Sequence, residues 1–110
     1  MTKKRKPRTD RNHVIYRITN LKTGDFYIGL TVIRGGALKK SLDIRWKGHQ
    51  YKAFVEKKNT IFCKALRKYG PAAFHMEGEW IIRGKSAAHA EERQMVAELN
   101  PVYNRLLKAA

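Results

Sequence analysis

Arg45 and His49 are two side chains suited to phosphate chemistry, and they stand four residues apart. In a helix this spacing puts both on one face, where they can meet a single ligand. A guanidinium can grip phosphate oxygens through two hydrogen bonds and stabilise charge that develops on them, and an imidazole can hold or move a proton. In a chain this basic, the same pair can also form an ordinary solvated helix face.

Glu92 is an acidic residue on the apolar face of a predicted helix. It shares that face with Ala88, Met95, Val96 and Leu99. Glu91 and Glu98 fall on another side of the helix, as expected of solvent-facing charges. A carboxylate among apolar side chains needs a partner, which is either a cation in a structural salt bridge or a hard divalent metal ion.

Two tyrosines occur in short β-branched and aromatic runs near the N-terminus. Tyr16 ends Val14-Ile15-Tyr16, and Tyr27 begins Tyr27-Ile28-Gly29. The segment between the runs, residues 20–25, has the Asn, Gly and Asp expected of a turn, so the pattern predicts an antiparallel hairpin. Tyrosine is a common strand residue and an asparagine after a helix, such as Asn104, commonly serves a turn, so these residues alone leave their roles open.

Two helices are expected after the hairpin. Residues 31–40 contain Gly35-Gly36 without periodicity and predict a surface loop. The first helix should run from Leu38 or Ser41 to about Val55, because apolar and aromatic side chains recur at helical steps, at Leu42, Trp46, His49 and Ala53. Gly48 interrupts this helix, which indicates either a close approach of a backbone or ligand, or a mild kink. The second helix, from Ile61 to Tyr69, should stop at Gly70-Pro71.

A third strand and a last helix complete the expected order. Residues 74–82 alternate, with one apolar face made of Phe74, Met76, Trp80 and Ile82. Ser86 can cap a final helix that runs to about Leu99, before Asn100-Pro101. The sequence therefore predicts an α+β fold, a three-stranded antiparallel sheet flanked by helices in the order β-β-α-α-β-α. A chain of 110 residues fits one domain, here residues 13–110, behind a flexible basic arm, residues 1–12.

The charge of the chain predicts a polyanionic partner. Lys and Arg number 24 against nine acidic residues, which gives a net charge of +15. Candidate nucleic-acid contacts lie in the arm and along the first helix, at Lys3, Lys4, Arg5, Lys6, Arg8, Lys39, Lys40, Lys47 and Lys52. Charge alone would equally suit a ribosomal, chromatin-like or membrane-surface protein, so it identifies a partner class and no activity.

Cysteine and histidine positions narrow the chemistry further. Cys63 is the single cysteine, which excludes an intrachain disulfide and a cysteine-rich zinc site, and its apolar neighbours indicate a buried thiol. His13, His75 and His89 show no metal-ligand spacing. No apolar run reaches membrane-spanning length and no secretory signal is evident, so we expect a soluble, cytoplasmic protein without a membrane partner.

Taken in order, these residues resemble the signature of the GIY-YIG nuclease superfamily. That signature is two tyrosine tripeptides on a hairpin, a helix bearing Arg and then His, a late helix bearing Glu, and a following Asn. The matching positions here are Tyr16, Tyr27, Arg45, His49, Glu92 and Asn104. Ala65-Leu66-Arg67-Lys68-Tyr69-Gly70 also looks like the family's helix end, and the resemblance covers residues 14–104. Val14 replaces the first Gly, and the connection from Gly29 to Arg45 is longer than in compact members.

The resemblance implies hydrolysis of a phosphodiester bond with one divalent ion, Mg²⁺ or Mn²⁺, held by Glu92. Tyr16 would be the base or part of the relay that removes a proton from the attacking water, with Tyr27 and His49 positioning it. Arg45 would stabilise the phosphate in the transition state, and Asn104 would orient a tyrosine or the backbone of the site. A phenol has a pKa of about 10, so Tyr16 would need nearby positive charge to act as a base at neutral pH.

The sequence thus favours a small stand-alone, metal-dependent endonuclease acting on double-stranded DNA. Two alternatives stay open: a non-catalytic DNA- or RNA-binding module, which the charge alone would explain, and a nuclease subunit that needs a recognition partner. Cutting both strands requires either a homo-oligomer or two successive nicks. A basic module of this size favours phage or mobile-element biology over repair or restriction.

Overall fold

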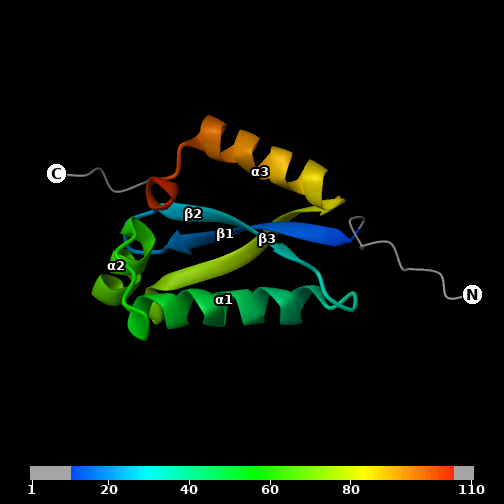
Figure 1. Cartoon of the computed structure of the whole chain (residues 1–110). Helices are drawn as coiled ribbons and strands as arrows, with labels where there is room; N and C mark the ends of the chain where they lie inside the picture. Colours follow the sequence, from blue (N-terminus) through cyan, green and yellow to red (C-terminus); the bar gives the residue numbers. More distant parts are fainter. Residues whose placement is uncertain (1–10, 106–110) are drawn as a thin grey trace, which may run out of the picture.

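The computed structural model describes residues 11–105 and has the predicted α+β architecture (Figure 1). The three strands are β1 (Asn12–Asn20), β2 (Phe26–Val32) and β3 (Phe74–Arg83). The helices are α1 (Leu38–Phe54), α2 (Ile61–Tyr69) and α3 (Lys85–Leu99), with short 3-10 turns η1 (Pro71–Ala73) and η2 (Val102–Asn104). The predicted order β-β-α-α-β-α is confirmed, and the sheet is antiparallel with the strand order β2-β1-β3.

The sheet separates two hydrophobic clusters, because α3 covers one face and α1 covers the other (Figure 1). On the α3 face, Ile15 and Ile28 pack with Met95. On the opposite face, Tyr16 and Ile18 pack with side chains of α1, α2 and η2, namely Ala53, Phe62, Cys63, Ala65, Leu66 and Tyr103. Both faces of β1 are therefore buried, and Cys63 is a buried thiol as predicted.

The first helix begins at Leu38, the earlier of its two predicted starts, and the loop before it is shorter than predicted. Residues 31–40 were expected to form a loop, but β2 continues to Val32 and α1 starts at Leu38, which leaves residues 33–37 as the connection. This connection is tied down at both ends: Ile33 N donates to Asn12 O at 2.8 Å, and Arg34 N donates to Ser41 Oγ at 3.1 Å. These bonds satisfy backbone groups of the connection on both sides, next to the end of β2, which runs two residues beyond its predicted end at Leu30.

The predicted alternation of β3 is wrong in its second half. Ile15 pairs with Trp80 and Tyr16 pairs with Gly78, so Glu79 is an extra residue in a β-bulge. Phe74 and Met76 pack in the α1 cluster, whereas Ile82 packs in the α3 cluster and Trp80 is 61% exposed. The extra residue inverts the alternation, and Glu79 forms a 2.7 Å salt bridge to Arg17.

The C-terminal ends of α2 and α3 agree with the predicted stop signals, whereas the predicted N-cap of α3 is wrong. The α2 helix ends at Gly70, which has φ 81°, and α3 ends at Asn100 in the left-handed conformation. Ser86 does not cap α3: the N-cap is Gly84, with φ 95° and no side-chain hydrogen bond, and Ser86 lies inside the helix. The predicted boundary of the arm at residue 12 falls on the first residue of β1.

Gly48 has no protein neighbour that would require a glycine. A Cβ placed there would meet nothing within 4 Å, so the expected close approach of another protein backbone is absent from the described part of the chain. Helix α1 continues through Gly48 to Phe54. None of the helices between residues 11 and 105 combines the length and apolar character that a bilayer span requires.

Candidate active site

Tyr16 lies at the centre of the sheet, and its ring covers Gly29 of the neighbouring strand. The two residues are direct cross-strand partners on β1 and β2. A Cβ at position 29 would overlap with Cζ and the hydroxyl of Tyr16. The glycine of Tyr27-Ile28-Gly29 thus provides the space that lets a tyrosine lie flat on β2 with no accessible surface.

The hydroxyl of Tyr16 joins the sheet to two side chains of α1. It lies 2.6 Å from Nε2 of His49 and accepts a hydrogen bond from Nε of Arg45 at 3.1 Å. The four-residue spacing of Arg45 and His49 directs both side chains toward β1, which confirms their predicted shared face. Within residues 11–105 Arg45 hydrogen-bonds only through Nε, which leaves its terminal nitrogens for a ligand.

Burial sets the protonation states of the Tyr16–His49 pair. Burial, with a contribution from Tyr27, raises the pKa of Tyr16 well above its ordinary value, although Arg45 opposes the shift. Burial, followed by the charges of Arg45 and Lys52, lowers the pKa of His49 to about 3. At neutral pH the phenol is therefore protonated and the imidazole is neutral. With the imidazole proton on Nδ1, Nε2 of His49 accepts the proton of Tyr16, whose oxygen already accepts from Arg45.

Tyr27 extends the site on the same face of the sheet. Its ring centroid lies 5.1 Å from that of His49 and 6.3 Å from that of Tyr16, both in edge-on arrangements. Burial raises the pKa of Tyr27, and Arg45 opposes this shift. Unlike Tyr16, Tyr27 is only half-buried, and with His49 it lines a cavity of about 340 Å³.

Glu92 reaches the site from α3 and is half-buried, with 24% of its side chain exposed. Burial raises its pKa, while the charges of His89 and Arg45 lower it, and Oε1 lies 3.9 Å from Nδ1 of His89. The predicted placement of Glu92 on the packed side of α3 is confirmed in this partial sense; Glu91 and Glu98 are exposed. Arg45 lies on α1, on the opposite face of the sheet (Figure 1), and it affects Glu92 through its charge.

Asn104 binds the backbone of β2 and contacts no tyrosine hydroxyl among the described residues. Its Oδ1 accepts from Ile28 N, and its Nδ2 donates to Ile28 O, each at 2.7 Å. The side chain therefore pairs with the free edge of β2 as a neighbouring strand would, between Tyr27 and Gly29. Of the two expected roles, the contacts match orientation of the site backbone.

Asn20 and Tyr103 support the site and were not singled out in the sequence. Asn20, considered there only as part of a turn, is fully buried at the end of β1. Its Nδ2 donates to the hydroxyl of Tyr103 at 3.1 Å, and its Oδ1 accepts from Lys22 N at 2.9 Å. This contact fixes η2, and so Asn104, against the hairpin. The only sequence feature that could have indicated a role for Tyr103 was its position next to Asn104.

The candidate basic contacts differ in how close they lie to this site. Lys39, Lys40 and Lys47 are exposed on α1, while Lys52 is half-buried and near enough to His49 to affect its pKa. Lys3, Lys4, Arg5, Lys6 and Arg8 lie outside the described residues. Between residues 11 and 105, no three His, Cys, Asp or Glu side chains converge on a point that could hold a metal ion.

Comparisons of the chain with protein-family models, curated proteins and solved structures found no match in any of the three.

Replacing Gly29 with alanine should displace Tyr16 and lower the free energy of unfolding by about 1–3 kcal/mol, the cost of overpacking a core. Gly78→Ala is the matched control, since Gly78 also lies opposite Tyr16 in the sheet. Its Cβ would lie 3.2 Å from Cγ2 of Val14, which is a tight contact without the overlap found at position 29. Gly78→Ala should stay within about 1 kcal/mol of wild type. Equal urea midpoints for the two variants would contradict the proposed role of Gly29.

His49 should make the fold less stable in acid. The unfolded chain protonates this histidine near its ordinary pKa of about 6.5, whereas the folded chain does so only at about 3. The contribution to stability is therefore complete above pH 6.5 and decreases as the pH falls toward 3, by up to about 1.4 kcal/mol per pH unit.

Urea unfolding at pH 7.5, 6.0 and 5.0 measures this dependence. His49→Gln should flatten it, while His75→Gln, which removes an exposed histidine, should keep the wild-type slope. A His49→Gln variant with the wild-type slope would show that another group is responsible.

Proposed function

We propose that this protein is a metal-dependent endonuclease that hydrolyses phosphodiester bonds in DNA. The observation that carries the proposal is the convergence of Arg45 and His49 on the hydroxyl of Tyr16, with the half-buried carboxylate of Glu92 electrostatically coupled to the same arginine. A purely structural or nucleic-acid-binding surface has no need for a buried phenol, a neutral imidazole and a desolvated carboxylate around one cation. The resemblance to the GIY-YIG superfamily supports the same conclusion.

Arg45 is the residue that we assign to the phosphate. Its Nε is held by Tyr16, so the guanidinium has a fixed orientation, and its terminal nitrogens can donate to two phosphate oxygens. The arginine is about half-buried, where its interaction with a charge that develops on the phosphate is stronger than in bulk water. Its charge therefore favours the transition state in which a water oxygen bonds to phosphorus while the ester P–O bond breaks.

Tyr16 and His49 are suited to a proton relay. A tyrosine with a raised pKa is a poor source of phenolate, so Tyr16 by itself is disfavoured as the base. Because Tyr16 has no accessible surface, the attacking water reaches this relay only after substrate binding rearranges the site; Tyr16 then gives its proton to Nε2 of His49 as it takes one from the water, and it remains neutral throughout. A bound phosphate makes this transfer easier, because its negative charge opposes the effect of Arg45 and Lys52 on the pKa of His49.

Glu92 is the residue that would hold the metal ion. Magnesium is commonly bound by one or two carboxylates, with water and substrate phosphate as its other ligands, so a single glutamate fits this ion. The raised pKa of Glu92 indicates a partly desolvated carboxylate whose charge the nearby His89 and Arg45 do not fully compensate. When bound, Mg²⁺ or Mn²⁺ would supply positive charge to the phosphate and the leaving oxygen.

The partner that the charge supports is DNA, with double-stranded DNA as the proposed substrate. A net charge of +15 favours binding to the phosphate backbone in any sequence, and the affinity should fall steeply with salt. The exposed lysines of α1 extend the positive charge along the helix that carries Arg45 and His49.

Glu92→Gln should lower cleavage of supercoiled plasmid at least about 100-fold. The variant lacks the carboxylate that would hold the metal ion, so the positive charge of the ion no longer stabilises the transition state. The assay uses purified protein with Mg²⁺ and follows nicked and linear products on a gel. Glu91→Gln, an exposed neighbour on the same helix, is the control and should cut like wild type.

Two outcomes would overturn parts of this proposal. Unchanged cutting by Glu92→Gln would remove Glu92 from the mechanism. If wild type cuts no supercoiled, linear, branched or single-stranded DNA but retards these molecules in a gel, the protein is a binding module, or a nuclease subunit that lacks its partner.

A further inference from the structure

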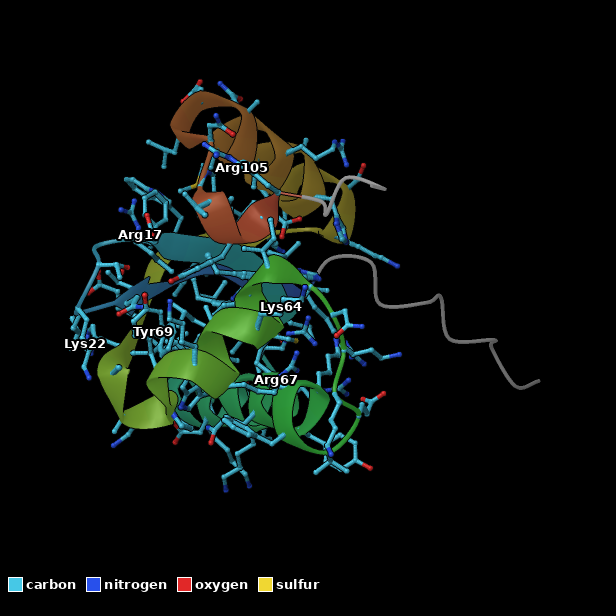
Figure 2. All side chains as sticks on the ribbon, turned by 90° about the vertical axis from the view of Figure 1, so that its left-hand side faces the viewer. Arg17, Lys22, Lys64, Arg67, Tyr69 and Arg105 are labelled. Atoms are coloured by element: carbon cyan, nitrogen blue, oxygen red, sulfur yellow. The ribbon has the colours of Figure 1, made fainter. Side chains whose placement is uncertain are left out.

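A cavity of about 340 Å³ adjoins the candidate active site and is not used by the proposed hydrolysis. It lies between the end of α1, the start of α2 and η2, and it shares Tyr27 and His49 with the site. Figure 2 shows α2 and η2 at the same end of the molecule, with Arg67 on α2 and Arg105 beside η2. The floor of the cavity is aromatic, formed by Tyr27 together with Phe62 and Tyr103.

Three cations from separate segments line the rim of this cavity. They are Lys52 in the last turn of α1, Lys58 in the connection to α2, and Arg105 directly after η2. Within residues 11–105, no carboxylate lies within 4.0 Å of the charged nitrogens of Lys52 or Arg105; Lys58 has an exposed contact of 3.8 Å with Glu56. The charge of Lys52 also extends to His49, whose pKa it helps to lower.

The backbone that carries these cations is anchored. Arg67 donates from Nη1 to the carbonyl oxygens of Ala53 and Lys58, each at 2.9 Å, which ties the end of α1 to the connection that follows. Asn104 holds η2 on β2 through both of its bonds to Ile28, so Arg105 follows a fixed residue. The cavity is therefore a formed recess with a basic rim.

The surface of α1 between Arg45 and this recess is open at Gly48. Lys52 lies seven residues after Arg45, about 10 Å along α1. Gly48 lies between them on the helix, and a Cβ added at Gly48 would meet no atom within 4 Å. A strand that places one phosphate at Arg45 can pass over Gly48 and bring its neighbouring phosphate to Lys52.

We propose that the recess binds the nucleotide next to the cleaved bond. Its phosphate contacts Lys52, Lys58 and Arg105, and its deoxyribose packs on the aromatic floor. This proposal rests on the endonuclease function. It adds a requirement for the substrate that hydrolysis of one bond would not impose: a negatively charged phosphate on the α2 side of the scissile bond. The recess then fixes the direction in which the strand crosses the site.

A neutral methylphosphonate at single positions beside the cleavage site tests the requirement directly. At the position that occupies the recess, this change should lower the kcat/KM of wild type about tenfold, the effect of losing charge-assisted hydrogen bonds. Lys52→Gln/Arg105→Gln should be slower on unmodified DNA but nearly insensitive to the same substitution. Lys22→Gln/Lys68→Gln removes two exposed lysines outside the recess and should respond to the methylphosphonate like wild type.

The results separate this proposal from the endonuclease proposal. If the Lys52→Gln/Arg105→Gln variant and wild type lose activity equally at every methylphosphonate position, the recess does not bind the neighbouring phosphate, although the protein cuts DNA. If wild type cuts no DNA, titration with thymidine 3′,5′-bisphosphate followed by amide NMR tests the recess alone. Shifts at Lys58, Thr60 and Arg105 that disappear in the double variant would support it, and their absence in wild type would overturn it.

Discussion

The hydroxyl of Tyr16 is the contact on which the arrangement of the site depends. It is buried in the central strand, hydrogen-bonds with Nε2 of His49 and accepts from Arg45, and so ties α1 to the sheet at two residues one helical turn apart. Burial disfavours both phenolate and imidazolium, so the Tyr16–His49 contact is between neutral groups, and the one charged member, Arg45, remains partly exposed. A buried pair that is fully hydrogen-bonded avoids the cost of an unsatisfied polar group and holds the guanidinium in one orientation.

Asn104 pairs with the free edge of β2 and links two parts of the site. Helices α1 and α3 lie on opposite faces of the sheet, and β2 forms one of its edges (Figure 1). Asn104 satisfies the backbone of Ile28 at this edge, which protects an otherwise unpaired strand and also anchors η2. One asparagine thereby links the hairpin that carries the tyrosines to the basic recess that contains Arg105.

The parts of the fold that depend on local chemistry were predictable from the sequence. Turn residues predicted the hairpin, and the four-residue spacing predicted the shared face of Arg45 and His49. Helical periodicity predicted that Glu92 lies on the packed side of α3. The bulge at Glu79 was missed because it depends on the register between β1 and β3. Likewise, the overlap of Tyr16 with position 29 and the Asn20–Tyr103 bond join residues far apart in the chain, and no local pattern specifies them. Ser86 was mistaken for a cap because Gly84, without a side chain to signal it, takes that position.

The most direct test of the central claim is ¹⁵N NMR of the His49 imidazole between pH 7.5 and 5.0. We expect a neutral ring over the whole range, protonated on Nδ1, with Nε2 as the acceptor of the Tyr16 proton. In Tyr16→Phe the Nε2 resonance should shift, because its donor is gone. A His49 ring that becomes protonated near pH 6.5, or that carries its proton on Nε2 whether or not Tyr16 is present, would contradict the account.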